Sequence, residues 1–486
     1  MEARIVSIES QLQSLAQMQK LVVSALGSRP SFSLPAGLNF FSQWEEQVSE
    51  VESAVAEARE ELKVPKAIGA FPDSGIATPE EEPSAEELEK LASNILDIIQ
   101  RYGQHLAPKD GDDQEASSGW LGKSMFMGKV LEQLSKHQAI RMILPAFPWK
   151  SINQTDKVTG KLPDLGEELA LARLNQLCED IKAVYPLGGQ IHIATDGLLF
   201  DDVVGIPDED TWNYSEGLMA IVRERGYADN IKLLRAMDIL GFTDPESKPL
   251  DRETYLSLTQ QTRDELMTRY GRTEEEVREM MRDDNDTLLT YCGFVRFLET
   301  DLRHSAVAKE ASSGNKYRKM VKARAIQMML RAESFTKLLQ DLCPDYVRLS
   351  IHPSTGAVKL SVPLIVTGTG EFPRTPWHSS LAVARDGSYS TVHSKDVRDT
   401  HVLVARDDEA CSPYYFRERS GVWDWEDDEV VFEPVCPNRM VVRPSKKVNG
   451  LKSLSAEQLE KLKQLRAVHT AGPVEVVGFA NAASAI

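Results

Sequence analysis

Polar and apolar side chains alternate along two short stretches of "YVRLSIHPSTGAVKLSVPLIV", which starts at residue 346. Such alternation is typical of β-strands, and the "PSTG" turn between the stretches predicts an antiparallel hairpin. Side chains on one face of a hairpin lie side by side, so the polar ones should form a single wall. Arginine and lysine bind carboxylates or phosphates and histidine transfers protons, so this wall is a candidate site. A face that meets only water is the alternative interpretation. The wall consists of Arg348, Ser350, His352, Lys359 and Ser361.

A second group of charged side chains lies in "LPAFPWKSINQTDKVTGKLPDLGEELALARL", residues 144–174. An apolar run precedes this loop, a helical pattern follows it, and "GGQIHIATDG" predicts the next strand. Strand, helix and strand in this order build parallel sheets, whose ligands bind at the carboxyl ends of the strands. The loop that opens at Pro145 and the side chain of Asp196 therefore fall at the ligand edge. Asp164 starts the helix, where an aspartate is most often an N-cap.

The pattern of strands and helices that must position these residues predicts an α/β protein with a Rossmann-like mixed sheet flanked by helices. "TPWHSSLAVARDGSYSTVHS" predicts two more strands around an Asp-Gly turn, with Trp377 and His378 at its mouth. The pattern from 207 to 343, including "ADNIKLLRAMDIL", is charged and helical. Its longest cationic stretch contains Arg318 and Lys319, which are candidates for a phosphate contact; a solvated helix face is the usual alternative.

Residues 1–90 are expected to form a helical extension and an acidic linker. Two narrow apolar stripes at helical spacing come first, followed by a segment rich in Pro, Gly and Glu. The next helix starts with Ser84 as N-cap and Glu87 at the capping-box position. We expect the extension to dock on the main domain or to pair with another copy.

The overall composition limits the partners of the chain. Lys and Arg total 56 against 74 Asp and Glu, a net charge of −18, which repels nucleic acid and anionic membranes. The five cysteines are scattered and no apolar run reaches the length of a membrane span, so a cytoplasmic protein is expected. P-loop, dinucleotide-binding and hydrolase-elbow motifs are missing, and the nine histidines lack metal-ligand spacing. What remains suits acid-base chemistry on a small anionic substrate.

Several ordered motifs resemble the isocyanide (isonitrile) synthase family, also called the pyoverdine/dityrosine biosynthesis family. They are "LPAFPWKS", "KLPDLGEELALARLNQLCEDIKAVYPLGGQIHIATDGLLFDDVVGI", "YCGFVRFLETDL", "RLSIHPS" and "TPWHSS". The resemblance implies an enzyme that converts the α-amino group of an amino acid to an isocyanide, with C2 of ribulose 5-phosphate as the source of the carbon. It implies no metal and no organic cofactor.

The resemblance also suggests roles for individual residues. Asp196 and His352 are expected to transfer protons, and His378 to contact the carbonyl oxygen. Lys150 is expected to act at the site by its charge; a Schiff-base nucleophile is the alternative, but the substrate amine can itself attack the ketone. The remaining positions, which come from these motifs or from the polar wall, the loop and the cationic stretch described above, are expected to bind anions or substrate. Asp164 and Glu167 are expected to have supporting or capping roles. These remaining positions are Arg348, Lys359, Ser350, Trp377, Lys157, Arg318 and Lys319.

The resemblance divides the chain into an extension at 1–90, a synthase domain at 91–443 and a C-terminal segment at 444–486. That last segment resembles the opening of a taurine-dioxygenase-like domain, as in fungal synthase–dioxygenase fusions. Proteins of that layout make xanthocillin-type isocyanides from tyrosine, which makes tyrosine the expected substrate and a downstream dioxygenase domain an expected partner. Two competing interpretations remain: an aldolase-like enzyme acting on a sugar phosphate, and a non-catalytic scaffold.

Overall fold

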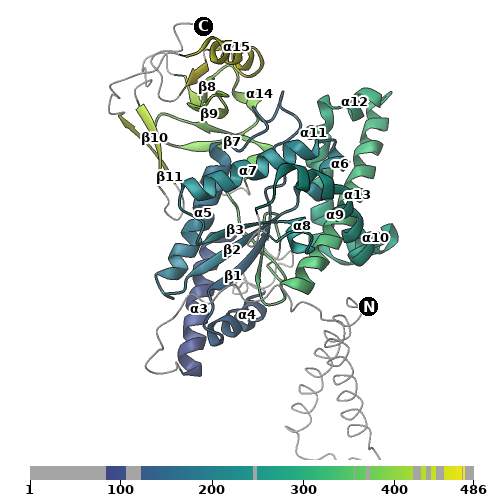
Figure 1. The fold of residues 1–486 in the computed structure, drawn as a ribbon, viewed down its shortest axis with the longest axis vertical. Coiled ribbons are helices and arrows are strands. Elements are labelled where there is room, and N and C mark those ends of the chain that lie inside the picture. The colour runs from purple at the N-terminus through teal and green to yellow at the C-terminus, as the bar shows by residue number, and fades with distance from the viewer. Residues whose placement is uncertain are drawn as a thin grey trace, which may run out of the picture. The chain divides into compact units, whose positions relative to one another are not determined.

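The computed structural model describes residues 84–104, 122–244, 249–354, 356–367, 373–419, 428–433, 439–444, 454–472 and 474–476. All of these belong to one compact unit, Glu81–Ile486. They form two five-stranded sheets and one two-stranded sheet, with helices packed around them (Figure 1). The two predicted apolar stripes near the N-terminus lie outside the described residues.

The first sheet is parallel throughout, with the strand order β3-β2-β1-β4-β5. The chain runs outward from β1 to β3 and then returns to place β4 on the other side of β1. The carboxyl ends of β1 and β4 therefore form the switch point at which α/β sheets bind ligands. The predicted α/β class is confirmed, although this sheet is parallel rather than mixed. Its strands are β1 (Ile140–Pro145), β2 (Gly189–Thr195), β3 (Ile231–Arg235), β4 (Val347–Ser350) and β5 (Leu360–Ser361).

Helices cover both faces of this sheet because successive strand side chains point in opposite directions. Met142 of β1 packs into one apolar cluster and the next residue, Ile143, into the other. The first cluster involves α3 (Ala85–Tyr102), α4 (Lys123–Ser135), α5 (Leu165–Lys182) and α7 (Asp208–Glu224). The second involves α6 (Asp201–Val204), α8 (Ala236–Ile239), α9 (Arg252–Tyr270), α10 (Glu274–Asp283), α11 (Asn285–Asp301), α12 (Ala306–Glu310) and α13 (Gly314–Leu342). Two 3-10 turns, η2 (Gly197–Leu199) and η3 (Leu302–His304), join these helices.

Two predictions about this sheet are wrong. The predicted hairpin at 347–364 is a parallel pair, with Leu349 opposite Leu360, because the connection carries the chain back before β5 starts. Ser361 Oγ donates a hydrogen bond of 2.7 Å to the carbonyl oxygen of His352 and holds that connection closed. Residues 231–235 form β3 instead of a helix, because pairing with β2 satisfies their backbone.

The second sheet has the order β12-β8-β9-β6-β7 and mixes parallel with antiparallel pairs. The predicted strand pair around the Asp-Gly turn is confirmed as β6 and β7, with Gly387 at φ +84°. The elements of this region are η4 (Pro376–His378), β6 (Ser380–Val383), β7 (Tyr389–Val392), α14 (Ser394–Val397), β8 (His401–Ala405), β9 (Pro413–Glu418), α15 (Ala456–His469) and β12 (Val474–Val476). A separate antiparallel pair joins β10 (Asp428–Glu433) to β11 (Arg439–Pro444).

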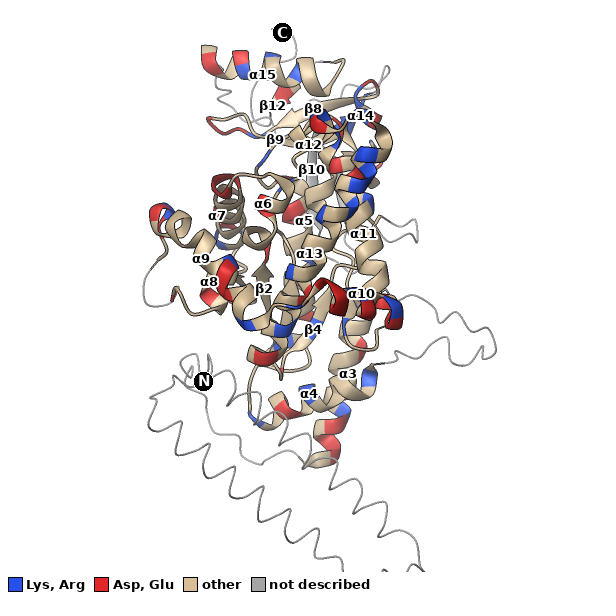
Figure 2. Cartoon of the chain, turned by 90° about the vertical axis from the view of Figure 1, so that its right-hand side faces the viewer, with Lys and Arg blue, Asp and Glu red and all other residues tan. Residues whose placement is uncertain are grey.

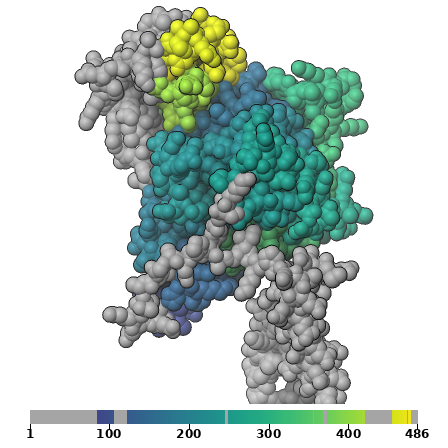
Figure 3. All heavy atoms as spheres, in the orientation of Figure 1, coloured from purple at the N-terminus to yellow at the C-terminus, as the bar shows by residue number. Residues whose placement is uncertain are grey.

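The C-terminal elements complete the second sheet. β12 pairs with β8 in parallel, and Leu462 of α15 is buried with Val474 and Leu403. Figure 3 shows α15, in yellow, packed on the light-green residues of this sheet. The segment up to Val476 therefore shares a sheet with residues expected to belong to the synthase domain; its resemblance to a dioxygenase stays a prediction. None of the described helices has the length and apolar character that crossing a bilayer requires.

Candidate active site

A cavity of about 720 Å³ opens at the carboxyl edge of the parallel sheet. Pro145 ends β1 and Ala146 follows it, Asp196 follows β2, and the residues from Arg348 to Pro353 belong to β4 and the turn after it. Helices α11 and α13 and the turn η4 supply the other walls. The cavity thus occupies the switch point of the sheet. The sequence-predicted site residues that line the cavity are Lys157, Asp196, Arg348, Ser350, His352, Lys359, Trp377 and His378.

At the floor of the cavity, a carboxyl group and a guanidinium affect each other's pKa without forming an ion pair. Burial raises the pKa of Asp196 to about 7, although the charge of Arg348 opposes this rise. Asp196 Oδ1 is buried and has no hydrogen-bond partner among the described residues. Burial lowers the pKa of Arg348 to about 10, which leaves the guanidinium charged at neutral pH. Asp196 can therefore gain or lose a proton near pH 7 beside a permanent positive charge.

Lys359 and a group of acidic side chains form the mixed-charge part of the cavity. Burial and the neighbouring Arg348 lower the pKa of Lys359, while Asp286, Glu333 and Asp284 act in the opposite direction. Burial raises the pKa of Glu333. Neither Arg348 nor Lys359 forms an ion pair within 4.0 Å with a described residue. Two cations held in this way are suited to meet the anionic groups of a substrate.

His352 lies between the charged floor and an aromatic wall. Burial, Lys359, His378 and Arg348 together lower the pKa of His352 to about 3, so its imidazole is neutral. Its backbone N–H donates to Ser350 Oγ at 3.1 Å, and its ring contacts Phe294 edge to face at 5.9 Å. A neutral imidazole with this pKa is a weak base, which favours hydrogen bonding over proton abstraction.

The aromatic wall comes from three separate elements. Phe200 lies 6.4 Å from Trp149 and 6.5 Å from Phe294, measured between ring centroids. Phe294 in turn contacts Phe297 at 5.8 Å. All four rings line the cavity. One part of the cavity is therefore apolar and could enclose an aromatic or aliphatic side chain.

His378 lies in η4, just before strand β6 of the second sheet, and faces an acidic partner from α11. Its Nδ1 is 3.2 Å from Asp301 Oδ2, and Lys157 forms an ion pair with the other oxygen of Asp301. Burial alone would raise the pKa of Asp301, but His378 and Lys157 outweigh it and hold the pKa at about 2. Burial lowers the pKa of His378 against the opposing charge of Asp301. The pair thus combines an ionised carboxylate with a neutral imidazole at neutral pH.

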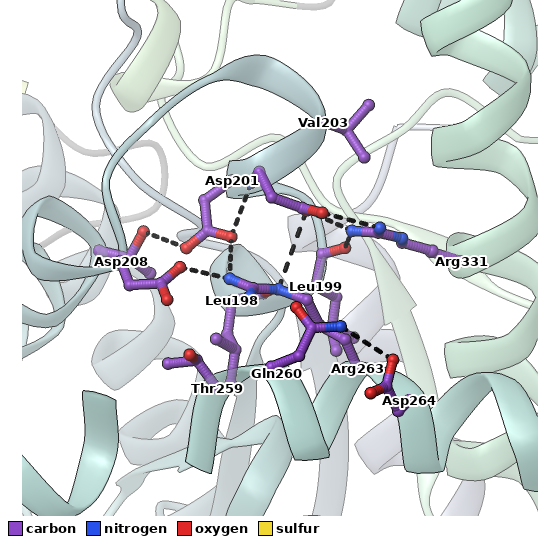
Figure 4. A network of polar contacts seen from close by, with 12 residues as sticks. Leu198, Leu199, Asp201, Val203, Asp208, Thr259, Gln260, Arg263, Asp264 and Arg331 are labelled. Carbon is purple, nitrogen blue, oxygen red and sulfur yellow. Dashed lines mark hydrogen bonds and ion pairs between the residues drawn. The ribbon is translucent and has the colours of Figure 1, made fainter. Parts of the chain in front are cut away.

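Two arginines fix the turn that follows Asp196. Arg263 Nε donates to the carbonyl oxygen of Leu198 at 2.8 Å, and Arg331 donates to that of Leu199 at 2.7 Å. Figure 4 shows both guanidinium groups pointing from α9 and α13 toward this turn, where carboxylates also bind them. At Gly197 there is no room for a side chain, because an added Cβ would lie 1.9 Å from the carbonyl oxygen of Pro148. The turn is therefore held rigidly beside the cavity.

Comparison with known proteins places the chain in a family. The pyoverdine/dityrosine biosynthesis protein family matches residues 130–404, a span that contains every residue of the cavity described above. The chain belongs to this family. The described fold agrees, since the crystal structure of the PvcA protein from Pseudomonas aeruginosa matches with a TM-score of 0.57 at 26% identity, over 68% of this chain and 100% of PvcA.

Two relatives extend the comparison within the pyoverdine/dityrosine family. Isocyanide synthase xanB from Aspergillus fumigatus is 40% identical over 372 residues, which are 75% of this chain and 47% of xanB. An L-tyrosine isonitrile synthase from Pseudomonas aeruginosa is 32% identical over 297 residues, which are 61% of this chain and 84% of that protein. The chain therefore spans about half the length of xanB.

Lys150, expected at the site from the family motif, does not line the cavity. It is buried, with Nζ at 2.8 Å from both Asp164 Oδ2 and Glu167 Oε2, and it donates to the carbonyl oxygen of Pro376 at 3.0 Å. Asp164 and Glu167 also form the capping box of α5, which confirms the predicted N-cap. These contacts do not fit a catalytic role. Lys150 instead ties the loop after β1 to the start of α5 and to η4.

Replacing Lys150 by Met should destabilise the fold, because it leaves two carboxyl groups buried without their cation. We expect a loss of about 3–5 kcal/mol in the free energy of unfolding at pH 8. The loss should be smaller at pH 5, because burial raises the pKa of Asp164 to about 7 and its carboxyl group can then be protonated. Urea denaturation at both pH values measures it, with Lys161→Met as control, since the Lys161–Asp210 pair is exposed and is worth at most about 1 kcal/mol. Wild-type stability at pH 8 combined with lost activity would restore a catalytic role for Lys150.

Arg318 and Lys319, predicted as phosphate contacts, do not line the cavity either. Both are exposed on α13, and Arg318 faces Glu299 at 3.4 Å. Figure 2 shows basic residues spread along α13. The solvated helix face, the alternative interpretation of this stretch, fits their placement.

The structure adds residues that the sequence analysis did not single out. Glu333, Asp286, Phe294 and Phe297 line the cavity, and Asp301 lies against His378 without lining it. Three of these belong to "YCGFVRFLETDL", a motif quoted for the resemblance but not resolved into single positions. The position of a residue on a helix does not by itself show whether its side chain faces a cavity or solvent. The motif as a whole was therefore the signal that could have pointed to these three residues. In the described part of the chain, no three His, Cys, Asp or Glu side chains are arranged to hold a metal ion. The expected independence of metals and cofactors stays a prediction.

Proposed function

We propose that this chain is an isocyanide synthase, which converts the α-amino group of an amino acid to an isocyanide. The observation that carries the proposal is the cavity floor, where the pKa of Asp196 is raised to about 7 beside the half-buried cation Arg348. Support also comes from relatives named isocyanide or isonitrile synthases. The carbon donor that we propose is ribulose 5-phosphate.

The polar part of the cavity offers the groups that this chemistry requires. An amino acid brings an ammonium and a carboxylate, and ribulose 5-phosphate brings a ketone and a phosphate. Attack of the amine on the ketone carbon needs a base for the proton on nitrogen and an acid for the carbinolamine oxygen. Asp196 can take either part because its pKa is about 7. Arg348 and Lys359 would bind the two anionic groups.

Tyrosine is the amino acid that we propose first. The four rings of the aromatic wall, contributed by Trp149, Phe200, Phe294 and Phe297, provide an apolar surface beside the charged floor. Aromatic side chains contribute both burial and ring contacts in such a pocket. The product would enter a secondary metabolite of xanthocillin type, with a dioxygenase as the next enzyme. We further propose a cytoplasmic location and a reaction that needs no metal or organic cofactor.

A panel of amino acids tests this function and its specificity. The purified chain is incubated with ribulose 5-phosphate and each amino acid, and the products are analysed by mass spectrometry. We expect tyrosine to yield a product one carbon heavier, and valine to react about 10-fold or more slowly, as poorer filling of an apolar pocket predicts. Cleavage of ribulose 5-phosphate without any amino acid would indicate an aldolase-like enzyme. No reaction with any amino acid would contradict the proposal.

A further inference from the structure

Where α11 meets η4 and the loop after β1, a carboxylate contacts an imidazole with one oxygen and an ammonium with the other. Asp301, the last residue of α11, is fully buried, and its two oxygens face different partners. Oδ2 lies 3.2 Å from His378 Nδ1, and Oδ1 receives the ion pair from Lys157, whose Nζ also donates to Thr300 Oγ1 at 3.2 Å. His378 Nδ1 and Asp301 Oδ2 are both buried, and neither meets hydrogen-bond geometry with a described residue, so the contact between them is the 3.2 Å approach of two otherwise unsatisfied polar atoms.

The imidazole ring of His378 is also held by packing. Its centroid lies 4.7 Å from that of Phe297 with 31° between the ring planes, and Trp377 adds a second contact at 6.3 Å. Since His378 lines the cavity while Nδ1 faces Asp301, the opposite nitrogen, Nε2, is the one available to a substrate. The geometry therefore separates a buried side of the ring from a substrate side.

We propose that Asp301 is a positioning residue that fixes His378 as the Nδ1–H tautomer, so that Nε2 accepts a proton from the substrate. This inference rests on the proposed function and names a base for it. In the step, the Nε2 lone pair forms a new N–H bond while an N–H bond of the substrate breaks, and its electron pair stays on the substrate nitrogen. The positive charge then carried by the ring is stabilised by the Asp301 carboxylate.

The charges around the ring favour this arrangement. The groups that act on His378 are Asp301 from α11, Lys157 and Lys150 from the loop after β1, and His352 after β4. His378 and Lys157 both lower the pKa of Asp301, and burial together with the two lysines lowers the pKa of His378 against the opposing charge of Asp301. A neutral ring whose Nδ1 faces a carboxylate must carry its proton on Nδ1, because the carboxylate can only accept a hydrogen bond.

Asp301→Asn should reverse the tautomer. The ammonium group of Lys157 requires an acceptor, so the amide oxygen of the new side chain should turn to Lys157 and its NH2 group to His378 Nδ1. That arrangement selects the Nε2–H tautomer, which cannot accept a proton from the substrate. We expect kcat to fall by about 10²–10⁴-fold with little change in KM.

The test uses nitrogen-15 NMR of the histidine side chains in the full chain, with the His378 signal assigned by its loss in His378→Gln. We expect the Nδ1–H tautomer in the wild type and the Nε2–H tautomer in Asp301→Asn. The control is Asp156→Asn, which makes the same change at the partly exposed Asp156–His304 pair, 2.9 Å apart, and should alter neither His378 nor kcat.

The outcomes separate this inference from the proposed function. An Nε2–H tautomer or a charged ring in the wild type at pH 7.5 would overturn the inference, and this measurement needs no folded variant. An unchanged kcat in Asp301→Asn, despite a reversed tautomer, would also overturn it. If the wild type forms no isocyanide with any amino acid, the proposed function fails, whereas the spectrum still decides whether Asp301 positions His378.

Discussion

Arg348→Met should nearly abolish isocyanide formation. The guanidinium lies on the cavity floor, carries its charge at neutral pH and forms no ion pair within 4.0 Å with a described residue. Removing the cationic partner of an anionic substrate group in a partly buried site costs about 2–5 kcal/mol of binding free energy. Because 1.4 kcal/mol is tenfold, kcat/KM should fall by roughly 30- to several thousand-fold.

Steady-state kinetics on both substrates measures this effect, and two further variants define it. Arg348→Lys keeps the charge but loses the planar fork, so it should recover only part of the activity. Arg278→Met, on the exposed face of α10, removes one arginine far from the cavity lining and should leave kcat/KM unchanged. Equal activity of Arg348→Met and wild type would exclude Arg348 as an anion contact.

Asp196→Asn should lower kcat and raise the free energy of unfolding at pH 8. As the proposed proton carrier, Asp196 should contribute about 10²–10⁴-fold to kcat. Its pKa of about 7 in the folded chain exceeds the unfolded value of about 3.9. A raised pKa contributes stability that is present below about pH 4 and lost as the pH rises through about 7. The Asn side chain has no such loss, so the variant should be more stable than wild type at pH 8, by a few kcal/mol, and similar to it at pH 4.

Urea denaturation at pH 4, 6 and 8, together with a pH profile of kcat, checks both halves of this prediction. In the wild type, a break in kcat near pH 7 is expected, and it should vanish in Asp196→Asn. Asp97→Asn is the matched control, because Asp97 is exposed in its pair with Lys123. An Asn variant that is less stable than wild type at pH 8 would show that the buried carboxyl group is satisfied in the folded chain.

Much of the fold could be predicted because its signals are local. The strand, helix and strand around α5, the capping box at Asp164 and the Asp-Gly turn before β7 all depend on residues close in sequence. The direction of β5 could not be predicted, because alternation is identical in parallel and antiparallel strands and only the path of the connection distinguishes them. β3 was missed for a related reason: a short apolar run such as "IKLLR" fits a strand or a helix until its neighbour is known.

The cavity could be predicted in part because parallel strands bring their carboxyl ends to one edge. This rule, with the family motifs, brought together Asp196, Arg348 and His352. It could not distinguish Lys150, which faces inward to α5, from Lys157, which lies in the same loop and lines the cavity. Which way a loop side chain points depends on partners that are distant in sequence, here the carboxyl groups of Glu167 and Asp301.

The fate of C2 of ribulose 5-phosphate tests the central claim most directly. The chain is incubated with ribulose 5-phosphate labelled with carbon-13 at C2 and with tyrosine labelled with nitrogen-15, and the product is examined by NMR and mass spectrometry. We predict an isocyanide in which the labelled carbon is bonded directly to the labelled nitrogen, and its loss in Arg348→Met. Unreacted tyrosine, or a product whose added carbon lacks the label, would contradict the account.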